Sequence, residues 1–188
     1  MLKNIFIPLI ITISIFGCST FKQTNEKGNK QLNSENNTWV IETNMGTIKI
    51  ELNGDKAPLT VARIKELTLS NFFNGIIFHR VIPGFVIQGG DPTGTGTGGS
   101  GKSIPDEFDN GLKHDKKGVV AMAHSSLPQS QDSQFYITLS PLEQLDEKYT
   151  VFGQVTEGMD VVVKISNVKT GPNDKPIEDV KMIKVTIE

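Results

Sequence analysis

Polar and hydrophobic residues alternate strictly in the segment TIKIEL at residues 47–52, a pattern typical of a β-strand with one buried face. The preceding segment WVIET at residues 39–43 and the short connection through Asn44 and Gly46 predict an antiparallel hairpin. Six further segments have the composition of short strands: 76–82, 85–88, 118–123, 134–139, 150–155 and 180–187. The pattern therefore predicts a mainly β domain with eight strands.

Two segments favour helices instead. Pro58 suits the first turn of a helix over residues 58–72, where Val61, Ile64 and Leu67 follow at intervals of three. A shorter helix fits residues 158–165, although the three consecutive valines within it have high strand propensity. Many short strands, frequent turn residues and only two helices predict an antiparallel sheet that closes into a barrel.

The first residues of the chain have a different composition from the rest. Lys3 precedes an apolar run at residues 5–16, which as a helix would be about 18 Å long and too short for a hydrocarbon core of about 30 Å. This arrangement is typical of a secretory signal peptide, and its end at Gly17 and Cys18 resembles the cleavage box of bacterial lipoproteins. We therefore expect a signal peptide at residues 1–17 and a lipid on Cys18. The alternative is an uncleaved signal anchor.

A polar segment separates this apolar run from the domain. Residues 19–38 contain only two large apolar side chains, Phe21 and Leu32, and show no helical or strand period. We interpret residues 18–38 as the lipidated cysteine with its flexible tether, and residues 39–188 as one domain. The expected location is the bacterial cell envelope, with the domain lipid-anchored on the periplasmic or extracellular side.

The net charge and one glycine-rich motif indicate whether the protein binds nucleic acid or nucleotides. The chain has a formal net charge of −2 at pH 7 and no basic run, which argues against a nucleic-acid partner. The segment GTGGSGKS at residues 96–103 matches the phosphate-binding pattern G-x-x-x-x-G-K-S/T. A helix must follow such a loop, but Pro105, Asn110 and Gly111 do not favour one. We therefore expect no bound nucleotide.

The segment FHRVIPGFVIQGGD at residues 78–91 resembles the signature of the cyclophilin-type peptidyl-prolyl cis–trans isomerases. Further blocks resemble that family in the same order: GTGTGG at 94–99, VAMAH at 120–124, DSQFYIT at 132–138 and LDEKYTVFG at 145–153. The resemblance covers residues 39–188 and implies a closed eight-stranded antiparallel β-barrel capped by two α-helices. It also implies isomerisation of X–Pro bonds in proline-containing polypeptides by a monomer, with no cofactor and no metal.

The resemblance also assigns site residues by position. It implies that Arg80, Phe85, Gln88 and Gln134 form the catalytic group. The implied substrate-binding residues are Val86, Ala123, His124, Tyr136, Gln144, Leu145 and Tyr149. In this scheme the Arg80 guanidinium donates a hydrogen bond to the proline nitrogen, which becomes an acceptor only when the amide bond is twisted.

The residue types alone leave alternatives open. Without the resemblance, Arg80 fits an exposed surface position, and Phe85 and Leu145 fit an ordinary hydrophobic core. His79 is interpreted as a hydrogen-bonded structural residue rather than a base. Two functions also stay open: an isomerase that assists the folding of exported polypeptides, and a non-catalytic chaperone or adhesin module that binds proline-containing segments.

Overall fold

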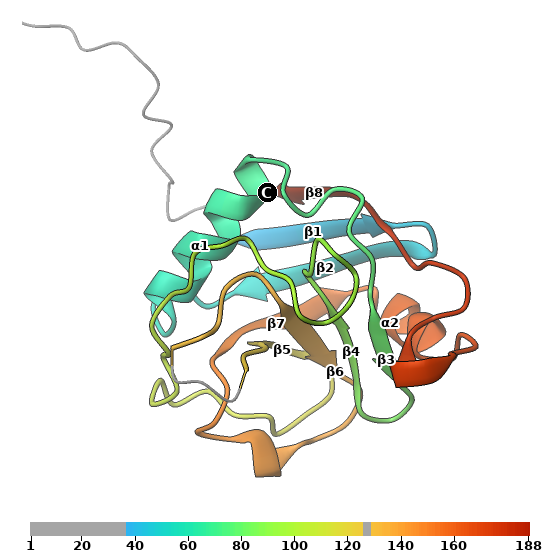
Figure 1. The fold of residues 1–188 in the computed structure, drawn as a ribbon. Helices are drawn as coiled ribbons and strands as arrows, with labels where there is room; N and C mark the ends of the chain where they lie inside the picture. Colours follow the sequence, from blue (N-terminus) through green and yellow to red (C-terminus); the bar gives the residue numbers. More distant parts are fainter. Residues whose placement is uncertain (1–36, 126–128) are drawn as a thin grey trace, which may run out of the picture. The chain divides into compact units, whose positions relative to one another are not determined.

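A computed structural model describes residues 37–125 and 129–188 of the 188-residue chain. The predicted signal peptide, Cys18 and nearly all of the predicted tether lie outside the described residues. The described elements are β1 Thr38–Thr43, β2 Gly46–Leu52, α1 Pro58–Leu69, β3 Arg80–Ile82, β4 Val86–Gly89, β5 Val119–Met122, β6 Phe135–Thr138, the 3-10 helix η1 Glu143–Leu145, β7 Val151–Glu157, α2 Met159–Ser166, the 3-10 helix η2 Pro172–Asp174 and β8 Met182–Ile187 (Figure 1). The eight predicted strands and both predicted α-helices are present.

All eight strands belong to one antiparallel sheet, in the order β3-β4-β6-β5-β7-β2-β1-β8. This sheet is curled but open, so the prediction of a closed barrel is wrong. β3 is only three residues long and pairs with β4, and residues 76–79 before it form no regular strand. A single bridge between Ile77 and Lys181, with neighbouring backbone hydrogen bonds such as that from Phe78 N–H to the Val180 carbonyl, connects the two edges. The edges therefore meet at one short segment instead of along a full ladder.

The two helices lie on different sides of the curled sheet (Figure 1). α1 packs beside β8, and α2 packs against β2, β3 and β4. The first turn of α1 has no side-chain cap of its own, and the carboxylate of Glu107 accepts hydrogen bonds from the backbone N–H groups of Leu59 and Thr60 instead. The β1–β2 turn requires Gly46, which has a φ of +137° and would place a Cβ 2.7 Å from Val161. No helix in the described part is long and apolar enough to cross a membrane.

The central strands bury side chains on both faces of the sheet. On β6, Phe135 and Ile137 belong to a large apolar cluster that includes Trp39, which we call the main core. Tyr136, between them, belongs to a smaller cluster on the opposite face, which we call the second cluster: Val86, Val119, Ala121, Tyr136, Leu142 and Val151. All four residues of β5 are buried because the strand contributes to both clusters in alternation.

Candidate active site

A cavity of about 200 Å³ lies over the second cluster, and we call it the proline pocket. Its lining residues come from β3, β4, β6, η1 and the loops beside them: Arg80, Phe85, Val86, Gln88, Ala123, His124, Tyr136, Leu145 and Tyr149. These are all the predicted site residues of the domain except Gln134 and Gln144. A concave pocket in which apolar side chains and a few polar groups converge is a common form of small ligand site.

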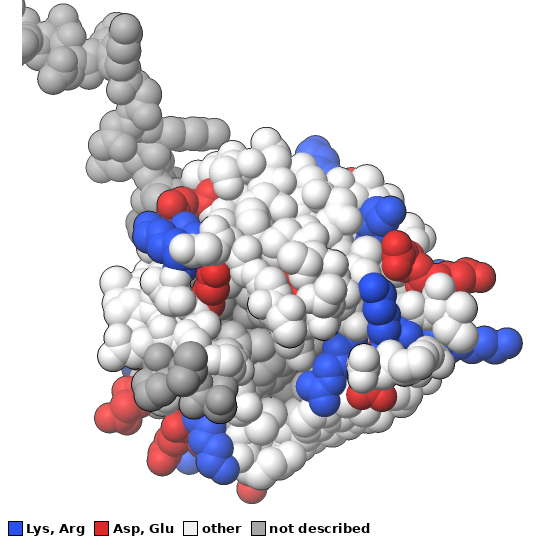
Figure 2. All heavy atoms as spheres, in the orientation of Figure 1, with Lys and Arg blue, Asp and Glu red and all other residues white. Residues whose placement is uncertain are grey.

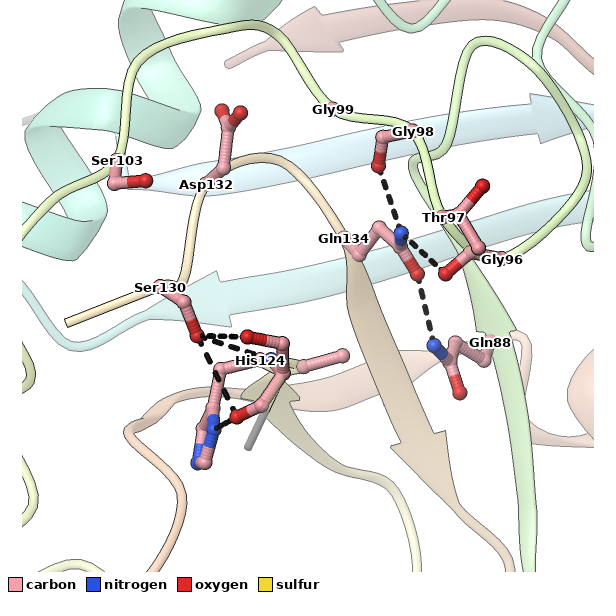
Figure 3. Close-up of a pocket in the computed structure, with 12 residues that line it drawn as sticks. Gln88, Gly96, Thr97, Gly98, Gly99, Ser103, His124, Ser130, Asp132 and Gln134 are labelled. Atoms are coloured by element: carbon pink, nitrogen blue, oxygen red, sulfur yellow. Dashed lines mark hydrogen bonds between the residues drawn. The ribbon is translucent and has the colours of Figure 1, made fainter. Parts of the chain in front are cut away.

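Antiparallel pairing of β3 with β4 positions the polar side chains at one edge of this pocket. Arg80 on β3 is the register partner of Gln88 on β4, so their side chains lie next to each other on one face of the sheet. The Arg80 Nη1 group donates to Gln88 Oε1 at 3.5 Å, and Gln88 Nε2 donates to Gln134 Oε1 at 2.9 Å. Gln134 Nε2 then donates to the carbonyls of Gly96, at 3.1 Å, and Gly98, at 2.8 Å (Figure 3).

This chain of hydrogen bonds fixes the orientation of both amides. The carbonyls of Gly96 and Gly98 can only accept, so the Gln134 NH₂ group must face them and its oxygen must face Gln88. Gln88 therefore donates to Gln134 and presents its own oxygen to Arg80. The glycine-rich loop is in this way connected to the guanidinium through two amides, although it lies outside the proline pocket.

A carboxylate approaches Arg80 from its other side. Asp174 Oδ2 is 3.7 Å from Arg80 Nε, and both side chains are about half exposed. Asp174 and the preceding Asn173 have φ values of +57° and +60°, in the left-handed region that non-glycine residues seldom occupy. The Arg80 guanidinium is therefore positioned between a carboxylate on η2 and an amide oxygen on β4.

The wall of the pocket contains a buried polar relay. The Tyr136 hydroxyl is 3.0 Å from His114 Nε2, and His114 Nδ1 is 2.9 Å from Asp146 Oδ1. An ionised Asp146 can only accept, so Nδ1 carries a proton, and in a neutral imidazole Nε2 accepts a hydrogen bond from the Tyr136 hydroxyl. Burial raises the pKa of the Tyr136 hydroxyl, which stays protonated. Burial opposes ionisation of Asp146 as well, but hydrogen bonds from the His114 backbone and ring hold its pKa below the ordinary value.

The sequence analysis missed His114 and Asp146. The available signal was the tyrosine itself, because a phenol in an apolar pocket needs a hydrogen-bond partner when it is buried. Above this relay, the His124 ring stacks on Tyr149 with centroids 4.6 Å apart, and its ring nitrogens face the carbonyls of Ser125 and Lys148. The predicted residues His124 and Tyr149 thus form one side of the pocket together.

A second cavity of about 410 Å³ adjoins the proline pocket, and we call it the loop pocket (Figure 3). It shares Gln88, Ala123 and His124 with the proline pocket and also contains Gln134. Gln144 lies exposed in η1 and lines neither cavity, and its backbone carbonyl accepts a hydrogen bond from Lys148 Nζ at 2.9 Å. A contact between the Gln144 side chain and a substrate stays a prediction.

The glycine-rich loop beside this cavity is organised by Asp91. One carboxylate oxygen of this buried residue accepts hydrogen bonds from the backbone N–H groups of Thr95, Gly96 and Gly98. Burial alone would raise the Asp91 pKa, but these bonds and those from Thr93 hold it well below the ordinary value. No helix follows the loop: Ile104 forms a bridge with Gln131, and residues 105–109 are irregular. The segment therefore lacks the helix N-terminus of a nucleotide-binding loop.

Figure 2 shows charged groups of both signs along the margin of one face of the molecule, without a large area of one sign. Within residues 37–125 and 129–188, no three His, Cys, Asp or Glu side chains are grouped so that they could hold a metal ion. The proline pocket itself is lined by hydrogen-bonding side chains such as Arg80 and Gln88 and by apolar side chains such as Phe85 and Leu145.

The fold and the pocket together define a cyclophilin-like domain, and comparisons with known proteins agree. The family model described as cyclophilin type peptidyl-prolyl cis-trans isomerase/CLD matches residues 38–187. The chain therefore belongs to this family, and its enzyme class is that of a peptidyl-prolyl cis–trans isomerase.

Individual relatives match over nearly the whole domain. Peptidyl-prolyl cis-trans isomerase-like 1 of Gibberella zeae is 44% identical over 151 residues, which cover 79% of this chain and 93% of that protein. The protein of the same name from Homo sapiens is 45% identical over 147 residues, which cover 77% and 88%. A cyclophilin type isomerase of Cryptosporidium parvum, crystallised in the presence of the dipeptide Ala-Pro, is 37% identical, with a TM-score of 0.77 over 80% of this chain and 98% of that chain.

Proposed function

We propose that the enzyme accelerates rotation about X–Pro bonds in polypeptides by binding the twisted amide more tightly than either planar isomer. Conjugation of the nitrogen lone pair with the carbonyl sets a barrier of about 18–20 kcal/mol to this rotation. Twisting localises the lone pair on nitrogen, which then accepts a hydrogen bond that neither ground state can accept. A donor aimed at this nitrogen stabilises the transition state selectively, which is the requirement for catalysis.

The position of Arg80 at the edge of the proline pocket is the observation that carries this proposal. Its guanidinium is always charged, and its hydrogen bond to Gln88 directs it along the side of the cavity. The proline ring packs on apolar side chains such as Phe85 and Leu145, while Gln88 and Gln134 hold the polar edge. These groups do not require a covalent intermediate, because the reaction neither makes nor breaks a bond.

The size of one hydrogen bond limits what Arg80 can contribute. A charge-assisted hydrogen bond is worth about 1.5–3 kcal/mol, or about tenfold to a hundredfold in rate. The remaining acceleration comes from the desolvated pocket and from fixing one side of the peptide while the other side rotates. Arg80 is thus one contributor among several.

A turnover assay tests this proposal. A protease that cleaves only the trans form of a short X–Pro peptide reports the rate of isomerisation, and Arg80→Ala should lower kcat/KM by about tenfold or more. Lys184→Ala is a matched control, because it removes an exposed positive charge on β8 from a side chain that lines neither the proline pocket nor the cavity beside it. Absence of wild-type turnover, together with retained binding of proline peptides, would favour the non-catalytic binding module instead.

We also propose that the enzyme acts on exported polypeptides as a lipid-anchored monomer at a bacterial cell envelope. The sequence of residues 1–38 supports this proposal, through the apolar run, Cys18 and the polar segment that follows. Expression in a bacterium with a labelled fatty acid tests it. The label should be incorporated into the wild-type chain and be lost with Cys18→Ala, which should also release the protein from the membrane fraction.

A further inference from the structure

The loop pocket is placed to receive a side chain of the polypeptide whose proline occupies the proline pocket. Both cavities share Gln88, Ala123 and His124 as lining residues, so they are contiguous. A residue of an extended chain spans only about 3.3–3.6 Å, and a neighbour of the proline therefore lies within reach of the adjoining cavity. The groups that line the loop pocket are therefore within reach of the residues that flank a proline bound in the proline pocket.

Among the described residues that line the loop pocket, Asp132 is the only Asp, Glu, Lys or Arg. In Figure 3, its carboxylate and the Ser103 hydroxyl lie on the side of the pocket opposite His124 and Ser130. The other lining side chains are neutral hydroxyls and amides, apart from His124 and Ala123. The described lining of the cavity therefore carries one carboxylate and no Lys or Arg side chain.

The loop holds this carboxylate in place without using all of its acceptor positions. The Ser100 hydroxyl donates to Asp132 Oδ1, and the Gly101 N–H donates to Oδ2 at 2.9 Å. A carboxylate has about four acceptor positions, so about two are still available for a ligand. The Asp132 side chain retains an exposed fraction of 16%. A Cβ at Gly99 would lie 2.5 Å from Oδ2, so a glycine there leaves room for the carboxylate.

The positive groups behind the loop are paired mainly with another acid. Arg63 Nη1 is 2.8 Å from Glu66 Oε2, and Lys102 Nζ is 3.5 Å from the same oxygen. The buried Arg63 approaches Asp132 less closely, with Nη2 3.9 Å from Oδ1. Coulomb attraction to Arg63 helps to orient the Asp132 carboxylate, while Glu66 forms the shorter ion pairs with Arg63 and Lys102.

We propose that Asp132 makes this enzyme select substrates that carry a lysine or arginine side chain close to the proline. The inference rests on the proposed isomerase function and adds a substrate class to it. An ammonium or guanidinium group in the loop pocket pairs with the Asp132 carboxylate and donates to its remaining acceptor positions. The long aliphatic stem of such a side chain packs along the cavity wall.

The test compares two nearly isosteric peptide series. Each peptide contains one proline in an alanine background, with lysine or uncharged norleucine at one position on either side of the proline. Wild-type enzyme should prefer lysine at one of these positions by about threefold to tenfold in kcat/KM, the size expected of a partly screened ion pair. The preference should shrink in 1 M NaCl, where the Debye length is about 3 Å.

Three variants assign the effect to this side chain. Asp132→Asn keeps an acceptor for Ser100 or Gly101 and should bring the lysine-to-norleucine ratio to about one, whereas Asp132→Glu should retain a preference. Asp160→Asn removes the same charge from the exposed first turn of α2 and should leave the ratio unchanged. Thermal melts show whether each variant is folded. If Asp132→Asn does not fold, the role of Asp132 is decided by two other measurements. These are the lysine-to-norleucine ratio of Asp132→Glu and the salt dependence of the wild-type ratio.

The outcomes for the two proposals can be told apart. Normal turnover with no lysine preference at any position, or the same preference in wild type and Asp132→Asn, would overturn the role of Asp132 and leave the isomerase function intact. Absence of turnover with every peptide would contradict the isomerase function. In that case the ratio of peptide dissociation constants, measured by calorimetry on the same series, would decide the role of Asp132.

Discussion

The two faces of strand β6 carry out different tasks with neighbouring residues. Phe135 points into the main core, where its ring contacts Trp39 and Phe73 at centroid distances of 4.8 and 6.0 Å. Tyr136, one residue later, points to the second cluster and forms part of the proline pocket. Alternation along one strand thus places residues that stabilise the fold on one face and residues of the proposed substrate pocket on the other. A substitution on one face therefore does not directly remove contacts on the other face.

Phe135→Ala should produce the largest effect on stability, because it opens a cavity in the main core. The side chain is completely buried, and truncation of such a phenylalanine costs about 3–5 kcal/mol of unfolding free energy. The folded fraction should keep near-normal affinity for a proline peptide, because the pocket lies on the other face. Urea denaturation and peptide titration of the same sample measure both quantities. If Phe135→Ala lost peptide affinity without losing unfolding free energy, the two faces of β6 would not have separate roles.

Lowering the pH should lower the free energy of unfolding, because it protonates Asp91, whose carboxylate holds the glycine-rich loop in place. Its pKa is lowered in the folded state, so its contribution is complete above the unfolded value of about 3.9 and is lost as the pH falls below it. Asp91→Asn should lower stability at pH 7, because an amide cannot accept as many of the loop N–H groups. It should also reduce the decline in stability as the pH falls from about 4 to about 2. Urea midpoints across this range would contradict the account if both proteins declined equally.

Tyr136→Phe should have a smaller effect that is confined to the second cluster. It removes the hydroxyl that faces His114 Nε2 and leaves a buried ring nitrogen without that partner, at a cost of about 1–3 kcal/mol in stability. The apolar surface offered to proline is kept, so kcat/KM should fall by less than the tenfold expected for Arg80→Ala. Parallel thermal melts and turnover assays measure the two effects. A fall in turnover without destabilisation would instead assign the hydroxyl to catalysis.

Lys102→Ala should have the smallest effect of the series. The side chain is 64% exposed and its ion pair with Glu66 spans 3.5 Å, so its removal should change stability by less than about 0.5 kcal/mol. Wild-type protein should show no shift in melting temperature with ATP or GTP and magnesium, because no helix follows the loop. A nucleotide-dependent shift that disappears in Lys102→Ala would reverse this interpretation.

The elements of the fold could be predicted because alternation and helical spacing act locally. Closure of the barrel could not, because it depends on how residues 76–79 meet the chain before β8, where only Ile77 and Lys181 form a bridge. The prediction of a hydrogen-bonded His79 was also wrong in part. The residue is buried as expected for a structural histidine, but neither ring nitrogen has a hydrogen-bond partner among the described residues.

In the candidate site, too, residues within short matching segments could be predicted, whereas contacts between distant segments could not. Nine pocket residues could be named from the family resemblance, since each stands within or beside a short matching block. His114 and Asp174 could not, because they lie outside the matching blocks and meet Tyr136 and Arg80 only through long-range contacts in the folded chain. Asp146 lies inside the last block, but its contact with His114 likewise depends on the fold. Asp132 lies inside a recognised block, but its place beside the loop pocket depends on the path of residues 96–101.

The central claim is that Arg80 stabilises the twisted amide and contributes little to binding of either planar isomer. Exchange NMR on an X–Pro peptide at equilibrium measures the dissociation constant and the rate of isomerisation on the enzyme in one sample. For Arg80→Ala, the account predicts an on-enzyme rate lower by about tenfold or more, with a dissociation constant within about twofold of wild type. An unchanged on-enzyme rate with weaker peptide binding would contradict it, because Arg80 would then serve the ground state alone.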